Sequence, residues 1–215
     1  MASLLPFVRG SLSNHPMAAS FANEVLRVHS RYANEIVGAF SFCPFMKDVE
    51  SSFGHFCVML DPIPDRERTV EAVMEATSSV MHIVFPLIDI EPSPFERFAA
   101  GVRETLTVRM RNPPVMAVFH PRLGGDFSTS HRVVGVIRRA PDPFVQFVPE
   151  GLHEGGTVFM ETFDISLLNI KSHAEQNFQK VQGPGGEEVL RRLADIHADR
   201  EKSYAPYLKE LLGRA

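Results

Sequence analysis

The sequence contains no tryptophan and only two cysteines among its 215 residues. Two cysteines without a Cys-x-x-Cys pattern or a Cys/His zinc spacing exclude a disulfide framework and a zinc-finger class of protein. This cysteine usage is typical of a reducing compartment, so we expect a cytoplasmic location. The longest apolar runs, such as Val80 to Ile88, are shorter than a membrane span, and residues 1–16 lack a signal-peptide core.

An excess of basic charge is also missing. The chain carries 22 lysines and arginines against 26 acidic residues, which gives a net charge of -4 at pH 7. The basic residues are scattered along the chain, whereas nucleic-acid-binding proteins gather them in patches. We therefore expect neither nucleic acid nor a membrane as a partner.

Phenylalanine and other apolar residues, by contrast, are plentiful and regularly spaced. Apolar residues recur at helical spacing from Phe21 to Phe40, which predicts a helix with one buried face. Short apolar runs bounded by prolines alternate with further helical patterns, and they predict strands over residues 56–60, 80–86, 115–119 and 144–148. This alternation predicts an α/β fold, with a single sheet of about four or five strands flanked by helices and a C-terminal helical appendage.

The length and the turn residues predict how the chain is divided. We expect a loose N-terminal tail over residues 1–16, an α/β domain over 17–181 and a C-terminal helical segment over 187–215. Within the domain, residues 157–165 have the character of an extra strand. Three glycines and a proline in Gln182 to Gly186 predict a linker. The leucine and tyrosine face of the C-terminal segment allows docking on a partner or on a second copy of the chain, and it equally allows packing on the chain's own domain.

One cysteine lies in a position that suits chemistry. Cys43 follows the first predicted helix, next to a helix-ending proline, and Lys47 could stabilise its thiolate. The alternative is that Cys43 is a small buried hydrophobic residue, which is a common role of free cysteine. Cys57 lies inside a predicted strand, and we expect it in the core.

A histidine and an arginine pair complete the candidate set. His120 closes an apolar strand, at the edge of a sheet where α/β proteins bind ligands. Arg139 ends a helix, and its planar guanidinium suits a carboxylate or a phosphate. Arg122 and Arg138 are neighbouring candidates for substrate binding. We predict that Cys43, His120 and Arg139 line one cleft. The alternatives are a histidine hydrogen-bonded at a strand end and surface arginines at a helix end.

Three short motifs resemble a known family. The segment Phe42 to Lys47 reads Phe-Cys-Pro-Phe-Met-Lys and is similar to the Leu-Cys-Pro-Phe-Ala-Lys signature of the bacterial family known as domain of unknown function number 1415. Val118 to Pro121 resembles its Ser-Phe-His-Pro motif, and Arg139 to Pro143 resembles its Arg-Ser-Pro-x-Pro motif. The matches keep the order of the family's motifs, but the resemblance implies no activity.

The chain departs from the family pattern just before Arg139. The family usually has an Asn-Tyr pair and a further asparagine there, whereas this chain has Gly135, Val136 and Arg138. The departure favours a member with a changed substrate.

Three functions follow from these residues. The first is an enzyme acting on a small anionic molecule, with Cys43 as nucleophile or redox thiol, His120 as acid or base, and Arg139 with Lys47 as the anion clamp. The second is a haem-binding protein or haem-dependent enzyme in which Cys43, followed by Pro44, or His120 ligates the iron. The third is a non-enzymatic interaction module.

Overall fold

The computed structural model describes residues 5–43, 53–78, 80–149 and 174–213. Its centre is one five-stranded sheet in the order β1-β2-β3-β5-β4. The strands are β1 (Phe7–Arg9), β2 (His55–Met59), β3 (Met81–Val84), β4 (Val115–Phe119) and β5 (Phe144–Val148). β1, β2 and β3 are parallel, and β5 is antiparallel to both β3 and β4, so β4 runs in the same direction as the first three strands.

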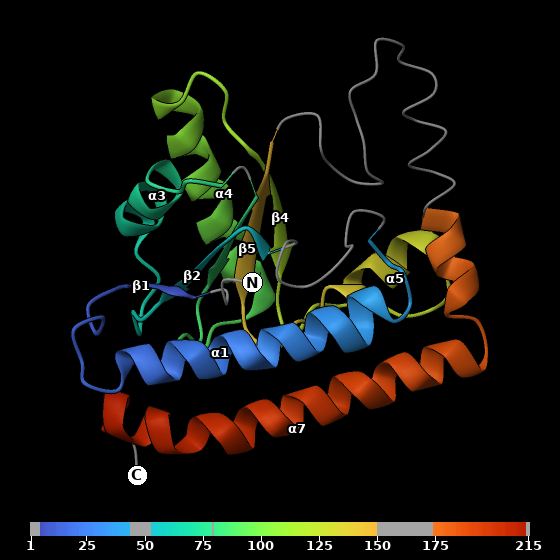
Figure 1. Cartoon of the computed structure of the whole chain (residues 1–215). Coiled ribbons are helices and arrows are strands. Elements are labelled where there is room, and N and C mark those ends of the chain that lie inside the picture. The colour runs from blue at the N-terminus through green and yellow to red at the C-terminus, as the bar shows by residue number, and fades with distance from the viewer. Residues whose placement is uncertain (1–4, 44–52, 79, 150–173, 214–215) are drawn as a thin grey trace.

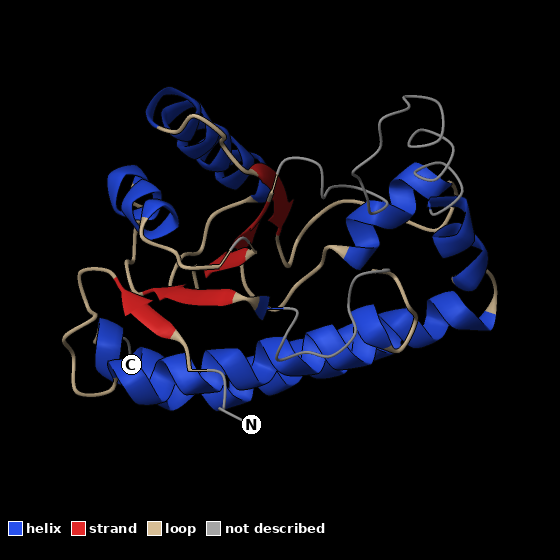
Figure 2. Ribbon diagram, turned by 45° about the horizontal axis from the view of Figure 1, so that its top comes forward, coloured by secondary structure: helices blue, strands red, loops and turns tan. Residues whose placement is uncertain are grey.

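Helices cover both faces of this sheet and confirm the predicted α/β fold. The helices are α1 (Ala18–Tyr32), which continues into the π-helical turn η1 (Ala33–Gly38), α3 (Arg66–Met74), α4 (Pro92–Arg109), α5 (Ser130–Ile137) and α7 (Pro184–Leu212). α1 and α7 lie together on one side of the strands, and α3 and α4 lie on the other side (Figures 1 and 2).

The alternation of side chains along β2 shows how the sequence fills both layers. Phe56 and Val58 pack toward α1 and α7, whereas Cys57 and Met59 pack toward α3 and α4. A strand that is covered on both faces reads as a continuous apolar run, as β2 does. Cys57 is fully buried, as predicted, and burial raises the pKa of its thiol to about 12.

The N-terminal residues show the first departure from the predicted division. β1 pairs with β2 at the edge of the sheet, and the Leu12 N–H donates to the Leu60 carbonyl at 3.1 Å. The Ser11 N–H donates to the Asp61 carboxylate at 2.8 Å. The prediction of a loose tail over residues 1–16 is therefore wrong for Phe7–Arg9 and the loop after it. A three-residue strand is too short to show a periodic pattern.

The second departure is at the predicted linker. α7 begins at Pro184, so Pro184, Gly185 and Gly186 form its first turn instead of a flexible connection. The N–H groups of a first helical turn have no partner within the helix, so proline costs nothing there. The chain reverses at Gly183, whose φ of +57° favours glycine.

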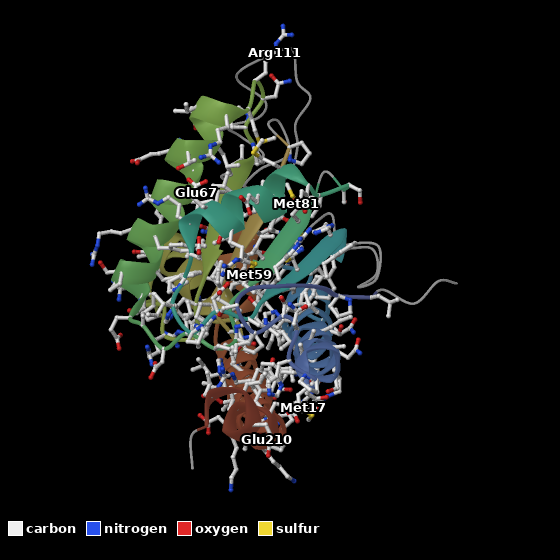
Figure 3. All side chains as sticks on the ribbon, turned by 90° about the vertical axis from the view of Figure 1, so that its left-hand side faces the viewer. Met17, Met59, Glu67, Met81, Arg111 and Glu210 are labelled. Atoms are coloured by element: carbon white, nitrogen blue, oxygen red, sulfur yellow. The ribbon has the colours of Figure 1, made fainter. Side chains whose placement is uncertain are left out.

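The C-terminal helix is confirmed, and it packs lengthwise on α1. Phe21 of α1 packs against Tyr204 and Tyr207 of α7, with ring centroids 5.0 and 5.2 Å away. Met17 and Glu210 lie at the same end of this pair, so the two helices are antiparallel (Figure 3). The tyrosines of α7 thus pack within the chain, and self-association stays a prediction. No helix of the described residues is long and apolar enough to cross a membrane.

Candidate functional site

A buried polar network lies beside the carboxyl end of β3, at the kind of sheet edge where α/β proteins bind ligands. Asp142 lies just before β5 and is fully buried. Its carboxylate accepts hydrogen bonds from His29 Nε2 of α1 at 3.1 Å and from the Tyr204 hydroxyl of α7 at 2.9 Å. Arg200 of α7 donates to Asp142 at 2.9 Å and to the Pro86 carbonyl at 3.1 Å. The buried network therefore joins α1, α7 and the sheet.

Asp142 stays ionised in this setting. Burial alone would raise its pKa, but the charge of Arg200 and the hydrogen bonds from His29 and Tyr204 hold that pKa at about 2. Asp142 belongs to the Arg-Ala-Pro-Asp-Pro segment, in which sequence reasoning selected Arg139 and passed over the aspartate. The network is closed to substrate and is structural.

His120 is hydrogen-bonded at the end of β4, as in the alternative that we gave, and its catalytic role stays a prediction. It is fully buried, and its Nε2 donates to the Ile90 carbonyl at 3.0 Å. Its Nδ1 accepts from the Arg122 N–H at 3.1 Å. The Arg122 side chain reaches the same segment, where it pairs with Asp89 at 2.9 Å and donates to the Ile90 carbonyl. Both ring nitrogens of His120 therefore have a hydrogen-bond partner within the chain.

Arg138 and Arg139 follow one another at the end of α5, but their side chains have different partners. Arg139 Nε donates to the Leu123 carbonyl at 2.8 Å, and its Nη2 donates to the Gly125 carbonyl at 2.9 Å. Arg139 thus holds the loop at residues 123–125 and does not clamp a substrate in this arrangement. The guanidinium of Arg138 instead lies 5.5 Å above the Phe119 ring and lines a groove.

This groove, which we call the β4–α5 groove, is the candidate functional site. It has a volume of about 570 Å³. Its walls are three consecutive residues of β4, the loop at 123–125, one face of α5 and Glu96 of α4; the lining residues are Glu96, Met116, Ala117, Val118, Leu123, Gly124, Gly125, His131, Arg132, Val134, Gly135 and Arg138. Sequence reasoning named Arg138 as a binding candidate, but it did not select Arg132.

Basic side chains gather in the β4–α5 groove. Arg132, Arg138 and His131 line it together with the carboxylate of Glu96. Arg132 is held by an ion pair with Asp126 at 2.7 Å, and the Thr129 side chain caps α5 by accepting from the Arg132 N–H. Thr129 is therefore the N-cap of α5. Gly124 and Gly125 also line the groove, and Gly125 packs closely against the backbone of α5.

Cys43 lies away from this groove. The backbone before it is anchored, because Asn177 donates to the Phe42 carbonyl at 3.1 Å, and the thiol is half-buried. Cys43, His120 and Arg139 do not line the β4–α5 groove, so this groove is not the shared cleft that we predicted. Lys47 and Pro44 lie outside the described residues. Within the described part of the chain, no three His, Cys, Asp or Glu side chains gather as metal ligands.

A second histidine, His82, has a lowered pKa through which it should affect stability. His82 of β3 is buried, its Nδ1 donates to the Phe53 carbonyl at 2.9 Å, and its Nε2 lies 3.0 Å from the Gln146 amide nitrogen. Burial is the main cause that lowers the pKa of His82 to about 4. Protonation would also place two donors, His82 Nε2 and the Gln146 amide, against each other.

This lowered pKa predicts a pH dependence with a definite sign. Between the unfolded pKa near 6.5 and about 4, the unfolded chain binds a proton that the folded chain does not, so stability falls as the pH falls through that window. We expect His82 to account for roughly 2–3 kcal/mol of the loss. Urea unfolding between pH 7 and 4 should show that the free energy of unfolding declines less steeply with falling pH for His82→Gln than for the wild type. The exposed His131→Gln is the control, and equal slopes for all three proteins would contradict the assignment.

The fold and the groove define an α/β protein with an open, cation-lined site at the β4 edge of its sheet. Protein-family models, curated sequences and solved structures give no match to this chain. The resemblance to domain of unknown function number 1415 therefore stays a prediction.

Proposed function

We propose that this protein binds a small molecule carrying a carboxylate or phosphate group, and that the ligand lies in the β4–α5 groove. The observation that carries the proposal is that Arg132, Arg138 and His131 line one cavity of about 570 Å³. A guanidinium is a donor that proteins use for carboxylates and phosphates. The volume lies within the range of small-molecule sites.

The proposal keeps the anionic ligand of the first sequence hypothesis and changes the residues that hold it. Arg138 remains a binding residue, and Arg132 and His131 join it. Arg139 acts from behind the loop as a positioning residue, since its two hydrogen bonds fix the Leu123 and Gly125 carbonyls. Thiol or haem chemistry at Cys43 has no described partner residue and stays a hypothesis.

Replacing Arg138 should weaken anion binding while the fold is kept. Arg138→Gln removes the charge and the planar fork, and we expect the affinity for inorganic phosphate or acetate to fall by about tenfold, the equivalent of a charged hydrogen bond of about 1.4 kcal/mol. Isothermal titration and ¹⁵N chemical shifts of the groove residues measure the change. Arg103→Gln, at an exposed position of α4, is the matched control. Equal affinities in the two variants would refute the site.

A further inference from the structure

A second cavity lies at the edge of the sheet opposite to the β4–α5 groove. We call it the β1–α3 pocket, because its walls are the end of β1, the loop that follows β1, and one face of α3. Its volume is about 390 Å³, which lies within the range of small-molecule sites.

The course of the chain explains why a pocket opens at this place. β1 and β2 are parallel neighbours, and Arg9 lies beside Met59 at their carboxyl ends. The loop after β1 leads to α1 on one face of the sheet, whereas the loop after β2 leads to α3 on the other face (Figure 1). Adjacent strands whose connections leave to opposite faces create a crevice, and α/β proteins bind ligands in such crevices. The topology therefore marks this pocket independently of its residue types.

Asp61, just after β2, holds the two sides of the pocket together. Its buried carboxylate accepts from the Ser11 N–H at 2.8 Å and pairs with Arg68 of α3. Both bonds use Oδ1, and the buried Oδ2 has no hydrogen-bond partner among the described residues. A Cβ on Gly10 would come within 2.8 Å of this Oδ2. Since Gly10 lines the pocket, an unpartnered acceptor adjoins the pocket.

The charged side chains of the pocket are already compensated. Arg9 forms an ion pair with Glu75, and Arg68 forms one with Asp61. Glu71 acts on Arg68 through its charge, without a hydrogen bond. An anion would have to displace a carboxylate from an arginine, and a cation would have to share a carboxylate with an arginine. The pairing therefore disfavours both kinds of ion and favours a neutral ligand.

The polar groups that remain can both donate and accept hydrogen bonds. Within the described part of the chain, the side chains of Ser13, Asn14 and Glu71 make no hydrogen bond. A hydroxyl and an amide donate and accept, whereas a carboxylate accepts. Hydroxyl groups of a ligand match this set, because each of them donates and accepts. The apolar lining residues are Val8 and Ala72, which offer too little apolar surface for a flat aromatic ligand.

We propose that the β1–α3 pocket binds a small neutral polyhydroxyl compound, such as a monosaccharide or a cyclic polyol. Ser13, Asn14 and Glu71 bind its hydroxyl groups, and a hydroxyl group near Gly10 supplies the donor that Asp61 Oδ2 lacks. The pocket is separate from the β4–α5 groove, so this proposal and the proposed function can fail independently.

A titration followed by ¹⁵N chemical shifts tests the pocket with defined probes. The neutral probes are D-glucose, D-ribose and myo-inositol, and the ionic probes are methylammonium chloride and sodium phosphate. We expect at least one neutral probe to shift the amides of Gly10, Ser13, Asn14 and Glu71 saturably. Its affinity should change by less than about twofold between about 50 and about 500 mM NaCl, because salt screens charges and a neutral ligand has none.

Two variants connect this binding with the side chains of the pocket. Asn14→Ala and Glu71→Ala remove groups that make no hydrogen bond within the described chain, so both variants should fold. Each should bind the same neutral probe about fivefold more weakly, the equivalent of one hydrogen bond. Glu104→Ala, at an exposed position of α4, is the matched control. Wild-type affinity in both pocket variants would overturn the proposal.

The ionic probes decide whether the ligand is neutral. Saturable shifts of the same amides by methylammonium or phosphate, at lower concentration than any neutral probe requires, would show a site for ions and overturn the proposal. The absence of shifts with all three neutral probes would overturn it as well. Phosphate shifts confined to the β4–α5 groove, together with that absence, would leave the proposed function standing.

Discussion

We expect Asp142→Ala to lower the free energy of unfolding by about 3–5 kcal/mol, the range for breaking a buried ion pair from one side. The substitution leaves the guanidinium of Arg200 without its carboxylate and removes the acceptor of His29 and Tyr204. A buried charge without a partner costs more than the pair contributes, and the lost hydrogen bonds add to this cost. Urea unfolding at pH 7 measures the change.

The matched control is an aspartate in an exposed ion pair. Asp195 pairs with Arg191 on the surface of α7 at 2.7 Å, and Asp195→Asn should cost less than about 1 kcal/mol. Asp142→Asn keeps the shape of the side chain and loses its charge. Its free energy of unfolding should lie between the values of the alanine variant and the wild type. A cost below about 1 kcal/mol for Asp142→Ala would show that the network does not hold α7 on the sheet.

The fold could be predicted because apolar runs and helical spacings alternate along the chain. β2 and β3 are continuous apolar runs that end at prolines, and these features need no knowledge of the partners. β1 escaped prediction because it has three residues and gains its stability from pairing with β2. The start of α7 was misplaced because Pro184 and two glycines are typical of a turn, although a first helical turn also accepts them.

The candidate site could be predicted only in part, because residue type does not reveal which partner a side chain has. His120 and Arg139 are suited to chemistry, yet both are engaged by backbone carbonyls from distant segments. Asp142 lies between two prolines in the sequence, and its partners come from α1 and α7. Long-range contacts of this kind leave no pattern in a single sequence.

The departures from the resembled family fall on the groove that the structure reveals. Gly135 and Arg138 stand where that family usually has asparagine, and both line the β4–α5 groove. Within the resemblance, this coincidence favours a ligand that differs from that of other members. It also makes Gly135 the residue at which the shape of the groove is most easily tested.

Gly135→Ala should therefore disturb both the fold and the groove. A Cβ at Gly135 would overlap the carbonyl oxygen of Gly124 and approach the Gly125 Cα to 3.3 Å. Backbone atoms cannot turn away as a flexible side chain does, so the loop at 123–125 must move as a unit. Its movement would stretch the hydrogen bonds from Arg139 to Leu123 and Gly125. We expect a loss of about 2–3 kcal/mol in stability, as for other overpacked sites.

Gly124→Ala is the matched control, because a Cβ there meets no atom within 4 Å and its φ is not positive. The free energy of unfolding of that variant should lie within about 0.5 kcal/mol of the wild-type value, or slightly above it, because alanine restricts the unfolded chain. The amide shifts of Leu123 and Gly125 should change in Gly135→Ala, and phosphate affinity should fall with them. If Gly135→Ala matches Gly124→Ala in stability and in phosphate affinity, close contact between α5 and the loop does not shape the groove.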